Sequence, residues 1–195
     1  MKKLLLTLLT ALLLNSAWAG PEDDALKASA HKDVATVLKI VRPPALKGEA
    51  WAQTWLADLY INGQGMVQDD AQAVKWYRLA AQQGDVVAQS NLGAMYSNGR
   101  GVVQDYAEAI KWFRLGAQQG YAPAQYNLGV MYYDGQGVVQ DYVKAHSWYN
   151  LSAIKGDATS VKSRDIVAKR MTPQQIAEAQ KLARDCQAQN FKGCD

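Results

Sequence analysis

Apolar residues in the middle of the chain follow the period of an α-helix. Between residues 52 and 60 they occupy one helical face, at Ala52, Leu56, Leu59 and Tyr60. Glycines then interrupt the pattern, and a second apolar stripe follows at Ala73, Trp76, Tyr77, Ala80 and Ala81. Because spacings of three and four residues are typical of amphipathic helices, this pattern predicts two helices joined by a glycine turn.

The same arrangement returns every 36 residues. The positions that recur in strict register include Trp76, Trp112 and Trp148; Leu56, Leu92 and Leu128; and Gly63, Gly99 and Gly135. A period of this length indicates stacked units that are too small to bury their own apolar faces. The sequence therefore predicts an all-α fold, an α/α solenoid of antiparallel helix-turn-helix units. Because its unit has neighbours on both sides, Trp112 is expected to be the tryptophan whose loss destabilises the protein most.

An acidic residue precedes the second helix of each unit and is a candidate N-cap. These residues are Asp69, Asp105 and Asp141. Gln72 and Glu108 stand three residues after the first two caps, as in a capping box, whereas the third unit has Lys144 there.

Both ends of the array carry weaker helical patterns. Residues 24–50 resemble the second half of a unit without the aromatic signature, and Pro43 and Pro44 are expected to end that helix early. Helices are also predicted over 160–170 and 173–188, the latter capped by Thr172. The predicted division is a signal peptide (1–19), an N-terminal cap (20–51), three repeats (52–87, 88–123 and 124–159) and a degenerate C-terminal repeat with a disulfide (160–195).

The first 19 residues have the pattern of a cleaved signal peptide. Lys2 and Lys3 precede an apolar run over residues 4–14, and Ala17-Trp18-Ala19 supplies a cleavage site between Ala19 and Gly20. This pattern predicts a periplasmic or secreted protein, and the rest of the sequence has no second apolar stretch long enough for a membrane span. A retained, uncleaved anchor is the alternative interpretation.

Charge limits the possible partners. The net charge is +3, and removal of Lys2 and Lys3 with the leader would leave about +1. Binding to nucleic acid requires a clustered positive surface, which this sequence lacks. No cofactor and no metal are expected, since His31 has no second ligand at a metal-binding spacing.

The segment from residue 88 to 120, AQSNLGAMYSNGRGVVQDYAEAIKWFRLGAQQG, resembles a Sel1-like repeat, a relative of the tetratricopeptide repeat. The resemblance extends over roughly residues 45–159. It implies a right-handed superhelix and a non-enzymatic function as an adaptor that binds a protein or peptide.

Cys186 and Cys194 are the only cysteines. In an exported chain such a pair is expected to form a disulfide, whereas a redox-catalytic pair would more often be C-x-x-C. The C-x7-C spacing also resembles the cysteine pairs of the Helicobacter cysteine-rich proteins, in which the bridge ties one helix to the next.

Binding specificity is expected where the units differ. In superhelical arrays of helix pairs the first helices line the concave side, so their outward positions form a candidate groove for an extended peptide. The candidate groove residues are Thr54, Trp55, Asp58, Ser90, Asn91, Tyr126, Asn127 and Tyr133. A solvated face without a ligand is the alternative.

One short motif suggests chemistry. Ser152 and Lys155 match S-x-x-K, the nucleophile motif of penicillin-recognising enzymes, so a penicillin-binding or β-lactamase-like enzyme is the alternative function. Ser152, however, stands at the small helix-contact position of the repeat, and S-D-N and K-T-G are missing from the sequence. His146 occupies the place of Val74 and Ile110 and is expected to be a packing residue.

Overall fold

The computed structural model describes residues 20–194, and within this range the chain forms ten α-helices, a single 3₁₀ turn and no strand. The all-α prediction is thus confirmed. The predicted leader, residues 1–19, lies outside the described residues. The elements are α2 (Pro21–Ala30), α3 (Val34–Leu46), α4 (Ala50–Asn62), α5 (Asp70–Gln82), α6 (Val86–Asn98), α7 (Tyr106–Ala117), α8 (Ala122–Asp134), α9 (Tyr142–Ser152), η1 (Ala153–Lys155), α10 (Ala158–Ala168) and α11 (Pro173–Ala188).

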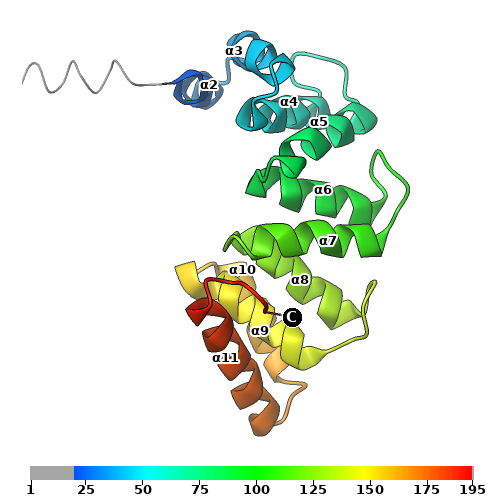
Figure 1. Cartoon of the computed structure of the whole chain (residues 1–195), viewed down its shortest axis with the longest axis vertical. Coiled ribbons are helices and arrows are strands. Elements are labelled where there is room, and N and C mark those ends of the chain that lie inside the picture. Colours follow the sequence, from blue (N-terminus) through cyan, green and yellow to red (C-terminus); the bar gives the residue numbers. More distant parts are fainter. Residues whose placement is uncertain (1–19, 195) are drawn as a thin grey trace, which may run out of the picture.

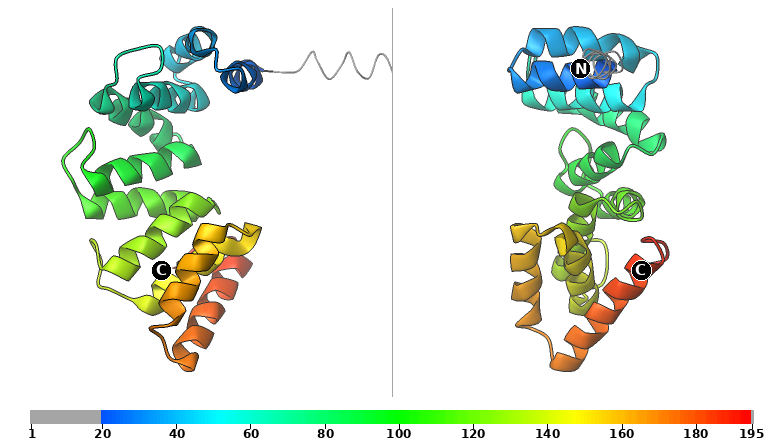
Figure 2. Two further views of the ribbon diagram at one scale, coloured as in Figure 1. Left: turned by 180° about the vertical axis from the view of Figure 1, so that it is seen from behind. Right: turned by 90° about the vertical axis from the view of Figure 1, so that its left-hand side faces the viewer.

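The helices form a solenoid of antiparallel pairs. The pairs α4/α5, α6/α7 and α8/α9 follow one another along the long axis of the molecule (Figure 1). Helix α3 packs against α4 at one end, and at the other end α10 and α11 diverge on either side of α9 (Figure 2). The turns between the paired helices all lie on the same edge of the solenoid (Figure 1).

The predicted aspartate caps are present. The side chains of Asp69, Asp105 and Asp141 accept hydrogen bonds from the backbone N–H groups of the residues three positions later. The backbone N–H of each cap does not complete a capping box. It donates instead to the carbonyl of Tyr60, Tyr96 or Tyr132, near the end of the preceding helix, at 3.1, 3.0 and 2.9 Å. Because the cap needs no acceptor from the helix that it starts, Lys144 can replace an acceptor in the third unit.

Small residues bring paired helices close together. A Cβ atom at Gly93 would lie 2.7 Å from the ring of Phe113, and one at Gly129 would lie 2.7 Å from the ring of Tyr149. Ala57 fills the equivalent place in the first unit and is fully buried. The aromatic residue after each tryptophan therefore packs directly on the backbone of the first helix.

A buried glutamine joins each first helix to the helix before it. The side-chain amides of Gln53, Gln89 and Gln125 donate to the carbonyls of Ala45, Ala81 and Ala117, at 3.3, 3.1 and 3.3 Å. These carbonyls lie in the last turns of α3, α5 and α7, where helical partners run out. We did not identify this set from the sequence, although it recurs every 36 residues.

The three tryptophans differ in burial, and Trp112, which was expected to matter most, is not the most buried of them. Trp148 is 3 % exposed, whereas Trp76 and Trp112 are only partly buried. The difference arises because α11 packs against α9, and its Ala183 and Cys186 join the same core cluster as Trp148. A terminal helix thus covers the last tryptophan more fully than a neighbouring repeat covers the middle one.

The N-terminal prediction needs one correction. Helix α3 continues through Pro43 and Pro44 and ends at Leu46. The φ of proline is that of a helix, so each proline removes one N–H donor to a carbonyl four residues earlier without turning the chain away, and the helix ends two residues after Pro44. The backbone N–H of Lys47 still donates to the carbonyls of both prolines, at 3.2 and 3.0 Å, and closes the turn.

At the C-terminus, α10 and α11 confirm the two predicted helices, and Thr172 with Gln175 forms a complete capping box. Cys186 and Cys194 form the expected disulfide, with an S–S distance of 2.00 Å. Closing a loop of this length stabilises the fold by about 2 to 3 kcal/mol in the chain-entropy description.

Candidate functional site

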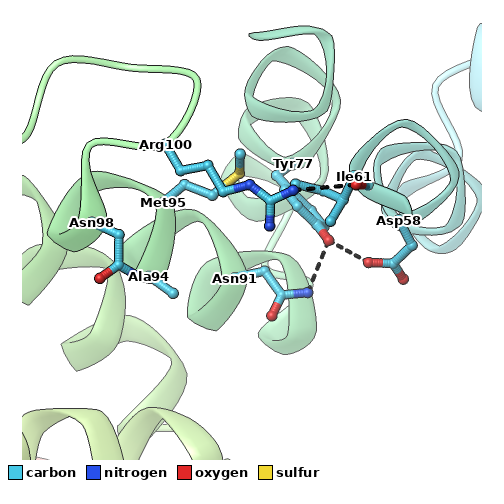
Figure 3. Close-up of a pocket in the computed structure, with 8 residues that line it drawn as sticks. All are labelled: Asp58, Ile61, Tyr77, Asn91, Ala94, Met95, Asn98 and Arg100. Atoms are coloured by element: carbon cyan, nitrogen blue, oxygen red, sulfur yellow. Dashed lines mark hydrogen bonds between the residues drawn. The ribbon is translucent and has the colours of Figure 1, made fainter. Parts of the chain in front are cut away.

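Open hollows lie beside the first helices of the units. One of about 550 Å³ lies between the turn joining α2 to α3 and helix α4, and includes Trp55 and Asp58. The next, of about 300 Å³, lies between α4 and α6 and also includes Asp58, together with Asn91 (Figure 3). Two further hollows, of about 330 and 210 Å³, lie between α8 and α10. We refer to these four hollows together as the first-helix groove.

A polar cluster forms the wall of the hollow between α4 and α6. The Tyr77 hydroxyl, from α5, donates a short hydrogen bond to Asp58 and accepts one from the Asn91 side-chain amide at 3.1 Å (Figure 3). Burial raises the pKa of the Asp58 carboxyl, and the hydrogen bond from Tyr77 opposes that shift. Burial, followed by the charge of Asp58, also raises the pKa of Tyr77 above its ordinary value. Asp58 and Asn91 were predicted as groove residues, whereas Tyr77 was placed only in the core.

Arg100 lines the same hollow and was missed in the sequence. It stands between Gly99 and Gly101, where the other units have Gln64 and Gln136. Its Nε lies 2.7 Å from an oxygen of Asp70, and its guanidinium also donates to the Ile61 carbonyl at 3.2 Å.

The ion pair of Arg100 crosses between units, from the loop after α6 to the start of α5. The hydrogen bond from Arg100 lowers the pKa of Asp70. The sequence carries one signal for this contact, which is that Arg100 replaces the glutamine found at the same loop position in the other two units.

Aromatic residues dominate the other half of the groove. Tyr126 packs on Tyr149, with ring centroids 5.3 Å apart, and its hydroxyl lies 3.4 Å from the Ser163 hydroxyl. Tyr126 and Asn127 both line the hollow of about 330 Å³, and Tyr133 lines the smaller one.

Tyr133 also belongs to a stack outside the hollow. Its ring lies 5.7 Å from that of Tyr142, and the Arg170 guanidinium lies 5.2 Å from its centroid. Part of its surface is therefore already occupied within the chain.

Two predicted groove residues are not at the surface. The side chains of Thr54 and Ser90 are 5 % and 3 % exposed. Helix α4 packs between α3 and α5, and helix α6 packs between α5 and α7, so these short side chains are covered. Tyr126 holds the equivalent position in α8 and is long enough to reach the hollow. Placing Thr54 and Ser90 on the open face was wrong.

The S-x-x-K serine is buried in the helix contact. Ser152 is 1 % exposed, and its hydroxyl donates to the Ser160 hydroxyl. A serine in this position is not presented to a substrate. Within the described residues, no group of three or more His, Cys, Asp or Glu side chains is arranged to hold a metal ion.

His146 is buried, as expected for a packing residue. Its side chain is 2 % exposed, and Nδ1 has no hydrogen-bond partner in the described part of the chain. Burial lowers the pKa of His146 below 6.5, Arg164 lowers it further, and Asp165 opposes the shift.

We expect His146→Val, which copies Val74 of the first unit, to flatten the pH dependence of unfolding. The unfolded chain takes up a proton near pH 6.5, whereas the folded chain resists it. The contribution of His146 to the free energy of unfolding is therefore fully present above pH 6.5. It is lost as the pH falls from 6.5 through the lower pKa that His146 has in the folded chain. Urea unfolding between pH 7.5 and 5 measures the slope. Equal slopes for wild type and variant would contradict this expectation.

The sequence pattern of the Sel1 repeat matches residues 52–85, 86–121 and 122–157, which together make up more than half of the chain. The chain belongs to the Sel1 repeat family. The distant similarity to Helicobacter cysteine-rich proteins is not among the relationships found, and no curated protein matches the sequence.

Several solved structures share the fold, among them the following two. A Sel1 repeat protein from Oxalobacter formigenes is 32% identical, with a TM-score of 0.69, over 74% of this chain and 59% of that protein. A protective antigen present in uropathogenic Escherichia coli strains, described as displaying an SLR fold, is 28% identical, with a TM-score of 0.50, over 80% of this chain and 42% of that protein. This chain thus spans less than two thirds of either relative.

Sel1 repeat proteins are typically scaffolds for protein–protein interaction. Among the described helices, none is both long and apolar enough to pass through a membrane.

Proposed function

We propose that this protein is an exported scaffold that binds an extended segment of a partner protein in the first-helix groove. The observation that carries the proposal is the series of open hollows beside successive first helices, walled by partly buried aromatic and amide side chains. Trp55 and Tyr126 offer large rigid contact areas, and asparagine amides offer a donor and an acceptor together.

The second helices α5 and α7 each pack between two first helices. Because directly packed helices lie about 8 to 10 Å apart and an extended peptide advances about 3.3 Å per residue, a bound segment would need more than three residues to pass from one first helix to the next. A side chain of the peptide would meet the same position of each unit in turn, so that differences between units become differences in recognition.

Export is supported by two features of the chain. The leader pattern ends at Ala19, and the disulfide between Cys186 and Cys194 is of a kind that persists in oxidising compartments. Mass spectrometry of the exported protein is expected to give a chain that begins at Gly20 and carries no free thiol. A chain that still carries residues 1–19 would contradict cleavage after Ala19. Two alkylatable cysteines would contradict the disulfide.

The groove is tested by removing its amides. We expect Asn91→Ala with Asn127→Ala to weaken partner binding by about 1 to 3 kcal/mol for each side chain, because each would leave a peptide group unpaired. Stability is expected to fall by only about 0.5 to 1.5 kcal/mol, since Asn91 makes one hydrogen bond to Tyr77. The partner is first isolated from an envelope extract, and affinity and melting temperature are then measured together.

Gln174→Ala with Gln180→Ala is the matched control, because both are exposed polar residues on α11. This pair is expected to bind as wild type does. Unchanged binding by the asparagine pair would exclude the first-helix groove and direct attention to the second-helix face.

A further inference from the structure

We propose that Asp58 anchors a cationic side chain, arginine or lysine, of the bound segment. This inference rests on the proposed function and names the chemistry that the N-terminal half of the groove recognises. Asp58 lines both the hollow beside the α2–α3 turn and the hollow between α4 and α6, so a ligand entering either one reaches its carboxylate.

The carboxylate of Asp58 lacks a cationic partner within the described residues. Arg100 shares the hollow, but its guanidinium is already paired with Asp70 and the Ile61 carbonyl. Lys32 lines the larger hollow without coming within ion-pair distance of Asp58. The Asp58 carboxylate accepts a hydrogen bond from the Tyr77 hydroxyl, which is a neutral group.

Burial without a countercharge is unfavourable for the carboxylate, and it raises the pKa of Asp58. A cation from a ligand would remove that penalty. Opposite charges in a partly desolvated site attract more strongly than they do in water, so the gain is larger here than at an exposed aspartate.

The surroundings of Asp58 favour an organic cation. Trp55 lies three residues earlier on α4, which places it on the same helical face, and both residues line the larger hollow. An indole ring beside a carboxylate suits an ammonium or guanidinium group on a hydrocarbon stem. A hard metal ion would need several oxygen ligands, which this single carboxylate does not supply.

The repeat position held by Asp58 is acidic in only one of the three units. The positions equivalent to Asp58 are Ala94 in the second unit and Val130 in the third. Tyr77, which orients the carboxylate, is replaced by Phe113 in the second unit. A charge at this position in one unit, with apolar residues at the same position in the other two, would set the register and direction of a bound segment.

The test is a selection from a random 12-residue peptide library on the full mature chain. Peptides that bind wild type are expected to carry arginine or lysine at one fixed position. A selected peptide is then compared with its twin carrying citrulline at that position, which keeps the shape but removes the charge. We expect the charged peptide to bind about 10- to 100-fold more tightly.

Asp58→Asn is expected to abolish this difference, since the amide keeps an acceptor for Tyr77 but loses the charge. Asp58→Ala, which copies Ala94, is the second variant and is expected to behave alike. Glu178→Gln, an exposed residue on α11, makes the same change in net charge and is expected to keep the full preference. Melting temperatures establish that each variant is folded.

Three results would be decisive. A preference for the charged peptide that is lost only in the Asp58 variants supports the inference. Selected peptides that lose affinity with Asn91→Ala and Asn127→Ala, yet bind equally with arginine or citrulline, overturn the cationic anchor and leave the groove intact. Selected peptides that are insensitive to all of these groove variants overturn the groove, and the anchor with it.

Discussion

Trp148→Ala is expected to destabilise the protein by about 3 to 5 kcal/mol, more than alanine at any other tryptophan of the array. The side chain is 3 % exposed and lies in the largest core cluster with Phe113, Leu128 and Cys186. Removing the ring would leave a cavity between α9 and α11 that rigid helices cannot close. Urea unfolding followed by circular dichroism measures the loss, and a native disulfide must be verified in each sample.

Trp76→Ala and Trp112→Ala are the matched comparisons because both rings occupy the same repeat position. They are only partly buried, so each substitution removes less contact and opens a site that water already reaches. We expect both to cost less than Trp148→Ala. A larger loss from Trp112→Ala would mean that position within the array matters more than burial.

Gly101→Ala is the second substitution with a large expected effect, about 2 to 5 kcal/mol. Gly101 has a φ of +68°, and a Cβ atom there would lie 2.3 Å from the backbone carbonyl oxygen of Asp70. The positive φ would strain the backbone of an alanine, and the close approach of its Cβ to Asp70 would force the loop after α6 away from the start of α5. The Arg100–Asp70 ion pair spans the same contact and would be disturbed.

Gly84→Ala separates the two causes. Gly84 also has a positive φ, +94°, but nothing lies within 4 Å of the position that its Cβ would take. It therefore carries the strain without the clash, and we expect Gly101→Ala to exceed it by about 1 to 3 kcal/mol in unfolding free energy. Equal losses would show that the loop can move away from α5 at little cost.

The helices could be predicted because each depends on local signals. Apolar periodicity, the aspartate caps and the glycines act within one unit, and three copies in register make their pattern unambiguous. The burial of Trp148 could not be predicted in this way, since it depends on how α11 packs against a helix that precedes it by more than twenty residues. Pro43 and Pro44 were predicted to end α3 early, but the helix runs two residues past Pro44, because proline removes an N–H donor and leaves the φ of a helix unchanged.

The candidate groove was predicted less well than the fold. Helical spacing placed Asp58, Asn91 and Asn127 beside hollows, but it could not distinguish Thr54 and Ser90, which neighbouring helices cover. Periodicity gives the direction of a side chain from its own helix. Whether a second helix blocks that direction depends on the separation of the helices and on side-chain length.

The buried glutamines have a consequence for how such an array can change over evolution. The side-chain amides of Gln53, Gln89 and Gln125 each donate to a backbone carbonyl of the preceding helix. The side-chain oxygens of Gln53 and Gln89 accept from Gln83 and Gln119, which belong to the same units as their partners. A hydrogen bond to a backbone carbonyl does not depend on which side chain the neighbouring unit carries at that position. Duplication of one 36-residue block in the gene would create a new unit whose glutamine finds its carbonyl at once, so the solenoid could lengthen without a compensating mutation at this junction.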